Sequence, residues 1–132
     1  MSHKNSKDLS NHRLEQAKED LAASKLLYDS KLYKSANNRA YYAIFHSIRS
    51  VLALEPIDFK KHKDVIAYFN KNYIRTEKFS KKMGRRIADA SKIREDSDYD
   101  DEFIVSEDDT QAQIQTAEEL INLVENYINE QK

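Results

Sequence analysis

The stretch "SANNRAYYAIFHSIRSVLAL", residues 35–54, decides the fold, because on a helix it is apolar around much of its circumference. Alanine, isoleucine, valine and leucine recur in it at helical spacing. Such a helix must be covered by other elements on several sides. We therefore expect residues 34–54 to form the most buried helix, and we expect Pro56 to stop it because proline cannot continue the hydrogen-bond ladder.

The rest of the chain predicts further helices that can cover this one. With one glycine and one proline among 132 residues, the sequence has too few turn formers for a protein of many strands. Apolar residues recur every three or four positions in four other segments. These are a first segment from about residue 10 to Tyr28, residues 60–73, residues 78–96, and the segment behind Ser106 up to Ile128. The prediction is an all-α, up-and-down bundle of about five helices.

Length and composition predict a single domain. Residues 1–9 are polar and are expected to be a flexible tail, and residues 10–132 are expected to form the helical domain. The formal net charge is −1, so a polyanion would have to meet a locally basic surface. Cysteine is absent, no signal peptide is visible, and the longest apolar run, Ala40–Phe45, is too short to span a bilayer. We expect a cytoplasmic protein without membrane contact.

Several local signals concern the ends and the weak points of the helices. Ser30 and Ser35 are candidate N-cap residues in the first connection, and Ser106 with Asp109 resembles a capping box. Gly84 lies inside a predicted helix and should weaken it by about 1 kcal/mol relative to alanine.

The central helix also carries a stripe of polar residues. Arg39 and His46 are seven positions apart, so on a helix they lie about 20° from alignment and ~10 Å apart along the axis. Tyr42 lies between them on the same face. We name this set the polar stripe: Asn38, Arg39, Tyr42, His46 and Arg49. Its ordinary interpretation is the solvent edge of an amphipathic helix.

The chemistry of the polar stripe suggests a second interpretation. Histidine can exchange protons near neutral pH, and arginine can hold a phosphate with two hydrogen bonds. These groups fit RNA cleavage by the 2′-hydroxyl, which needs neither a metal nor a protein nucleophile. The reaction needs two proton transfers, and one stripe contains a single histidine. A two-fold dimer that joins two stripes would supply a second one.

Residues 35–54 resemble the signature helix of HEPN domains, in particular of the small stand-alone UPF0332-type members. Arg39 through His46 is similar to the family's motif of an arginine and a histidine separated by four to six residues. The opening "RLEQAKEDLAASKLLYDSKLYKSA" (13–36) looks like the family's first helix. The segment "REDSDYDDEFIVSEDDTQAQIQTAEELINLVENYI" (94–128) looks like its C-terminal part.

The resemblance implies a helical bundle that dimerises through the motif helices, with no cofactor and no metal. Many HEPN proteins are metal-independent endoribonucleases. Small ones often act as toxins beside a minimal nucleotidyltransferase antitoxin, or in defence against phage. Arg39 would stabilise the phosphate and His46 would be the acid/base residue, with Asn38, Tyr42 and Arg49 supporting them or binding RNA.

An alternative function follows from one departure from the family pattern. In the best-characterised HEPN nucleases a polar residue follows the arginine, whereas here Asn38 precedes it and Ala40 follows it. A family member can keep the fold and act as a non-catalytic module that binds a nucleotidyltransferase partner or a nucleotide or RNA ligand.

Other polar clusters receive weaker assignments. The acidic segment from Glu95 to Glu102 lacks the glycine and the ligand spacing of a calcium loop, so we interpret it as a solvated loop. Within it, Asp98 and Tyr99 are candidates to support the motif helix or to border the cleft. His62 has no partner at catalytic spacing and is expected to be a surface residue. A basic run could be one polar helix face or a local RNA-binding surface; it comprises Lys78, Lys81, Lys82, Arg85, Arg86, Lys92 and Arg94.

Overall fold

The computed structural model describes residues 3–55 and 57–131 of the chain. Over these residues it contains five α-helices, one short π-helical segment and no strand. The elements are α1 (His3–Asp29), α2 (Tyr33–Ala53), α3 (His62–Phe69), η1 (Asn70–Ile74), α4 (Lys81–Tyr99) and α5 (Glu107–Glu130). The predicted all-α class is confirmed.

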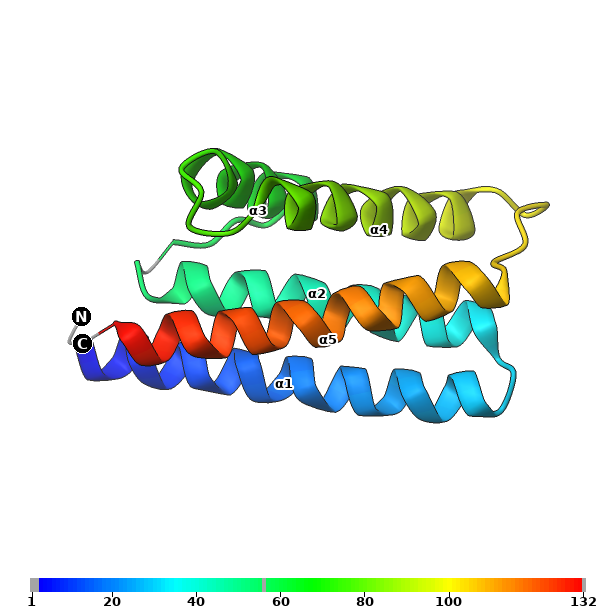
Figure 1. Ribbon diagram of the computed structural model, residues 1–132, viewed down its shortest axis with the longest axis horizontal. Helices are drawn as coiled ribbons and strands as arrows, with labels where there is room; N and C mark the ends of the chain where they lie inside the picture. Colours follow the sequence, from blue (N-terminus) through cyan, green and yellow to red (C-terminus); the bar gives the residue numbers. More distant parts are fainter. Residues whose placement is uncertain (1–2, 56, 132) are drawn as a thin grey trace.

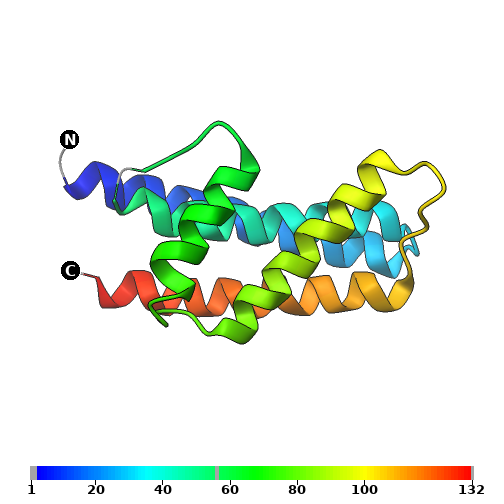
Figure 2. The same cartoon turned by 90° about the horizontal axis from the view of Figure 1, so that it is seen from above.

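The helices form two layers (Figure 1). α1, α2 and α5 lie side by side, with α1 running opposite to α2 and α5, and α3 and α4 lie over α2. α4 runs in the direction of α1, so the four long helices alternate in direction along the chain. Seen from above, α4 crosses this lower layer obliquely (Figure 2). α1 begins and α5 ends at the same end of the bundle (Figure 1). The predicted up-and-down arrangement is therefore correct.

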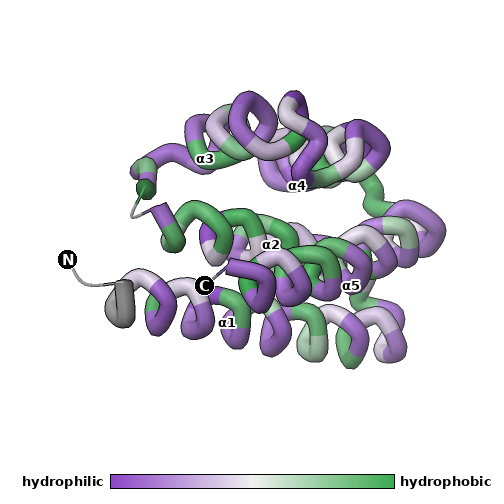
Figure 3. The backbone as a smooth tube through the Cα atoms, turned by 60° about the vertical axis from the view of Figure 1, so that its left-hand side comes forward, coloured by the Kyte–Doolittle hydropathy of each residue, from purple (hydrophilic) through white to green (hydrophobic). Residues whose placement is uncertain are grey.

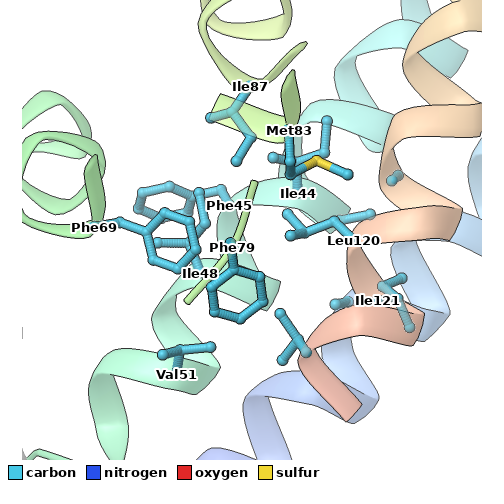
Figure 4. Packing of buried hydrophobic residues seen from close by; sticks show 14 of the residues in the cluster. Ile44, Phe45, Ile48, Val51, Phe69, Phe79, Met83, Ile87, Leu120 and Ile121 are labelled. Atoms are coloured by element: carbon cyan, nitrogen blue, oxygen red, sulfur yellow. The ribbon is translucent and has the colours of Figure 1, made fainter. Parts of the chain in front are cut away.

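α2 is the centre of the core, as expected from its sequence. More than half of its 21 residues are buried, and it packs against α1 and α5 in its own layer and against α3 and α4 above. Ile44 and Ile48 of α2 point toward Phe69, Ile87 and Leu120 from three other elements (Figure 4). In Figure 3 the hydrophobic parts of α2 lie between the layers, while much of α4 is hydrophilic.

Small residues set the register between α1 and α2. The Ser10 hydroxyl donates to the Ser50 carbonyl oxygen at 2.7 Å, and the Ser50 hydroxyl donates to the Ser10 carbonyl oxygen at 2.8 Å. Further along α1, the Ser24 hydroxyl donates to the Ala36 carbonyl oxygen at 2.6 Å. Because short side chains let the two backbones approach closely, these bonds fix α1 lengthwise along α2 and determine which residues face the polar stripe.

Two predictions at the beginning of the chain need correction. The first helix was expected from about residue 10 but begins at His3, where Ser6 packs into the bundle and the Lys7 ammonium donates to the Ile128 carbonyl oxygen at 3.1 Å. The division into a tail, residues 1–9, and a domain, residues 10–132, stays a prediction. Residues 1–2 lie outside the described part. Neither Ser30 nor Ser35 caps α2: its N-cap is Leu32, which makes no side-chain capping bond.

Other predicted boundaries agree more closely with the structure. α2 spans nearly the expected residues, and Pro56, which was expected to stop it, lies outside the described residues. The Ser106 hydroxyl caps α5 by accepting from the Asp109 amide at 2.9 Å, as the capping-box pattern predicts. The expected acidic loop is shorter than predicted, because α4 continues to Tyr99.

Close packing explains why a glycine occupies position 84, although helix propensity disfavours it. A Cβ atom at this position of α4 would lie 2.8 Å from Cγ2 of Ile74, in η1. The glycine therefore allows η1 to pack directly against the first turns of α4.

Candidate functional site

The polar stripe lies along a partly exposed edge of α2. The side chain of Arg39 is 42% exposed, that of Arg49 is 25% exposed, and that of His46 is 13% exposed. Asn38 and Tyr42 are half-buried on the same helix. The stripe is therefore more buried than a solvent edge would be, although Arg39 can still reach a ligand in water.

A residue of α1 that the sequence analysis did not single out connects the two predicted catalytic residues. Oδ1 of Asp20 lies 3.6 Å from Nη1 of Arg39, and Oδ2 lies 3.9 Å from Nε2 of His46. Asp20 is 8% exposed, and its Oδ2 has no hydrogen-bond partner among the described residues. Desolvation raises the pKa of Asp20, which the charge of Arg39 opposes. The carboxylate thus lies close to both the arginine and the imidazole.

His46 is placed so that its neutral form is favoured. Burial lowers its pKa from 6.5 to about 4, and the positive charges of Arg49, Arg13 and Arg39 act in the same direction. Nδ1 of His46 is buried and has no hydrogen-bond partner within residues 3–55 and 57–131. A neutral imidazole at neutral pH can accept a proton, which is what a general base does.

A second carboxylate fixes the other end of the stripe. Asp58, in the segment between α2 and α3, accepts from Nη2 of Arg49 at 2.8 Å and from Nη2 of Arg13 at 3.2 Å. Arg13 of α1 also donates to the Arg49 carbonyl oxygen at 3.2 Å. Asp58 therefore holds two guanidinium groups beside the stripe.

The second layer places two further side chains beside the Tyr42 ring, His62 from α3 and Arg94 from α4. The centre of the Tyr42 ring lies 5.8 Å from that of His62 in α3 and 6.0 Å from that of His46. The guanidinium carbon of Arg94 in α4 lies 5.9 Å from the centre of the Tyr42 ring, and that of Arg39 lies 5.7 Å from it. The expectation that His62 is a surface residue without a relevant partner is therefore wrong: it is half-buried at the site.

Asp98 and Tyr99 lie at different distances from this cluster. Oδ2 of Asp98 is 2.9 Å from Nε of Arg94, whose guanidinium lies over the Tyr41 and Tyr42 rings. Asp98 is thus connected to the stripe through Arg94. Tyr99 is 79% exposed at the end of α4, and its role in bordering a cleft stays a prediction.

A separate hollow lies between α4 and α5. It has a volume of about 590 Å³, and both positive and negative side chains line it. Its Arg86 already pairs with Glu119 and donates to the Thr116 hydroxyl at 3.1 Å. Because these groups pair with one another, the hollow does not define the charge of any ligand.

No three His, Cys, Asp or Glu side chains of the described residues come together as a group that could hold a metal ion. Likewise, none of the helices described here is long and apolar enough to cross a membrane.

Helix packing brings Asp20 and His62 to the site. The sequence contains an indication of this for Asp20 but not for His62. Asp20 lies three positions after Ala17 and four before Ser24, so it occupies the buried face of α1, where a charge is unusual. That position is a usable signal. His62 has no such signal, because it comes from a helix separated from the stripe by an irregular connection.

The fold and this edge define an all-α bundle whose central helix presents an arginine and a histidine to a shared carboxylate. The model of the HEPN domain family matches residues 10–127. The chain therefore belongs to the HEPN domain family, and its relatives place it with the small UPF0332-type members.

Individual relatives agree with this assignment. A "UPF0332 protein" of Thermotoga maritima is 31% identical over 116 residues, which is 88% of each chain. A protein of Methanocaldococcus jannaschii named "Putative toxin" is 38% identical over 86 residues, or 65% of this chain and 64% of the relative. Another protein with that description in the same organism is 28% identical over 115 residues, or 87% of this chain and 78% of the relative.

Proposed function

We propose that this protein is a metal-independent endoribonuclease that acts as a homodimer, and that it is the toxin of a two-component module with a minimal nucleotidyltransferase antitoxin or of a related defence module. The observation that carries the proposal is the convergence of Arg39 and His46 on the buried carboxylate of Asp20. The names of the two archaeal relatives support the toxin part of the proposal.

In the proposed reaction Arg39 binds the scissile phosphate. Its guanidinium carries a fixed positive charge and remains 42% exposed, so it can stabilise charge that develops on the phosphorane. His46, whose pKa is about 4, takes the proton of the attacking 2′-hydroxyl. Tyr42 lies between them and offers an aromatic face to a base. No residue is assigned to a metal.

The homodimer is proposed because a two-fold axis beside α2 would bring two polar stripes into one cleft. The partly exposed Tyr42 and Arg39 would then lie at an interface between two copies. The cytoplasm is the proposed location, since cellular RNA is the substrate.

The experiment compares wild type with Arg39→Ala and His46→Ala on diverse RNAs in the presence of EDTA. We expect wild type to cleave RNA, and each variant to lose about 10²- to 10⁴-fold in rate without loss of the folded dimer. His12→Ala is the matched control, because His12 is an exposed histidine of α1. If contamination-free wild type leaves all RNAs intact, the nuclease proposal fails.

A second candidate function is a non-catalytic module that binds a nucleotidyltransferase partner or a nucleotide ligand. One observation favours it: Ala40, which follows Arg39, is fully buried, so this position supplies no polar group to the stripe. The two candidates differ in growth assays. The nuclease should inhibit growth when it is expressed alone and lose this effect in His46→Ala, whereas the binding module should not inhibit growth through His46.

A further inference from the structure

The polar stripe leaves one requirement of the proposed reaction unmet. When the O2′–P bond forms and the P–O5′ bond breaks, the 2′-hydroxyl must lose a proton and the leaving 5′-oxygen must gain one. His46 can accept the first proton but, as a largely neutral imidazole, is poorly suited to supply the second. Arginine, in general, is not a proton donor at neutral pH, so Arg39 is not assigned this step. The His46 of a second copy would have the same environment and would be no better suited to donate, so another kind of proton-transfer group is needed.

His62 is the other histidine at this site. Its ring stacks on the Phe45 ring with centres 3.9 Å apart, and the His46 ring meets the same Phe45 ring at 5.7 Å. Both imidazoles also lie within 6.0 Å of the centre of the Tyr42 ring. Although they come from α2 and α3, the two histidines therefore border the same aromatic surface.

The contacts of His62 leave one ring nitrogen for a ligand. Nδ1 of His62 lies 3.2 Å from the Tyr41 hydroxyl. Burial raises the pKa of Tyr41 to about 12, so this phenol keeps its proton at neutral pH. When His62 is protonated, Nδ1–H can donate to the Tyr41 oxygen while Nε2–H remains for another acceptor. Tyr41 thus orients the ring.

Two arginines near His62, Arg94 and Arg49, would attract the phosphate of a bound RNA. Burial lowers the pKa of His62, and the charges of Arg94 and Arg49 lower it further. A phosphodiester bound among these groups brings a negative charge, which opposes their effect on the pKa of His62 and favours the imidazolium.

We propose that His62 is a second catalytic residue, the general acid that protonates the leaving 5′-oxygen, while His46 accepts the proton of the 2′-hydroxyl. The products are a 2′,3′-cyclic phosphate and a 5′-hydroxyl, and exchange with water restores both imidazoles. This inference rests on the proposed ribonuclease function.

The test uses two substrates that differ in one atom. The preferred cleavage site is mapped with wild type, and the same oligonucleotide is then made with sulfur in place of the bridging 5′-oxygen at that site. A thiolate leaves without being protonated, so the general acid becomes unnecessary. We expect His62→Ala to lose about 10²- to 10⁴-fold in rate on the oxygen substrate and to come within about tenfold of wild type on the sulfur substrate. His46→Ala should remain impaired on both.

A second variant separates chemistry from packing. His62→Phe keeps an aromatic ring against Phe45 but cannot transfer a proton, so it should behave like His62→Ala on both substrates. Circular dichroism melting checks the fold of each variant, and His12→Ala is again the control.

Other results of this experiment would contradict either the role of His62 or the role of His46. If both His62 variants cleave the oxygen substrate within about threefold of wild type, or lose equally on both substrates, His62 is not the general acid. If the His62 variants behave as expected while His46→Ala cleaves like wild type, the assignment of His46 in the proposed function fails instead. If wild type cleaves neither substrate, both proposals fall.

Discussion

At the residue scale, His46 shows how burial decides the chemistry of a side chain. Sequence spacing placed it beside Arg39, and that spacing would be the same on an exposed helix. The tertiary structure adds Asp20 from α1 and His62 from α3, and it removes much of the water around the imidazole. Helix packing therefore turns the polar stripe into a cluster of charged and titratable side chains with limited access to water.

The lowered pKa of His46 predicts a dependence of stability on pH. The unfolded chain binds a proton at this histidine below about pH 6.5, whereas the folded protein binds it only near pH 4. Because the unfolded state binds more protons between these values, His46 should reduce the free energy of unfolding as the pH falls from 6.5 toward 4. His62 acts in the same direction, while the raised pKa of Asp20 acts in the opposite one.

The His46 contribution is isolated by comparing wild type with His46→Gln in urea unfolding at several pH values. The loss of stability between pH 6.5 and 4 should be smaller in His46→Gln, which does not titrate. Parallel curves for the two proteins would contradict a lowered pKa at His46.

Asp20 should show a conflict between stability and activity. Its carboxylate is buried, and its Oδ2 lacks a hydrogen-bond partner among the described residues. The charged Arg39 stands 3.6 Å away, and the largely neutral His46 stands 3.9 Å away. Replacing it by the neutral Asp20→Asn should therefore raise the free energy of unfolding by about 1 kcal/mol. RNA cleavage should fall, because Arg39 loses the negative charge beside it and His46 loses its carboxylate neighbour.

Thermal unfolding and cleavage rates measured on the same samples check this prediction. Asp8→Asn, an exposed carboxylate of α1, is the control. A variant that is less stable than wild type would show that the carboxylate stabilises the fold instead.

At the element scale, α4 depends on a glycine that its helix propensity disfavours. Gly84→Ala would gain about 1 kcal/mol of propensity, but its Cβ would lie 2.8 Å from Cγ2 of Ile74. Since this methyl group is attached to the branched Cβ of a buried side chain, it cannot move away freely. We expect a net loss of about 1–3 kcal/mol.

Chemical denaturation measures this loss, with Ala88→Gly as the opposite change at an exposed position of the same helix. Two double variants test the contact. Gly84→Ala with Ile74→Val keeps the methyl group that clashes, and Gly84→Ala with Ile74→Ala removes it. Only the latter should therefore relieve the clash. A Gly84→Ala protein that is more stable than wild type would contradict the assigned contact.

At the scale of the whole molecule, the homodimer makes a prediction that no single chain can make. Arg39 and His46 lie near the same Asp20 within one chain, but two stripes in one cleft would also let Arg39 of one copy serve His46 of the other. In such a composite site, mixing inactive Arg39→Ala with inactive His46→Ala should restore cleavage. The heterodimer would contain one intact arginine and one intact histidine from opposite copies.

Subunits are exchanged by co-refolding, the mass is measured by light scattering, and cleavage is assayed with EDTA present. We expect up to about a quarter of wild-type activity, because half of the molecules in a random mixture are heterodimers and each keeps one of two composite pairs. A mixed dimer without activity would place the catalytic pair within one copy.

The sequence by itself determined the helical class, the central position of α2, the cap at Ser106 and the alignment of Arg39, Tyr42 and His46. These features depend on periodicity along one element, and a helix converts spacing into direction. The start of α1 was placed too late, because Ser6 and Lys7 make tertiary contacts that no apolar pattern in the sequence indicates.

Only the tertiary structure decided what surrounds the polar stripe. Asp20 reaches it because Ser10, Ser24 and Ser50 fix α1 lengthwise along α2, and His62 reaches it because α3 folds back over α2. Such contacts join positions whose distance in the sequence carries no periodic signal. Burial and the sum of nearby charges, which set the protonation of His46, likewise exist only once the helices are packed.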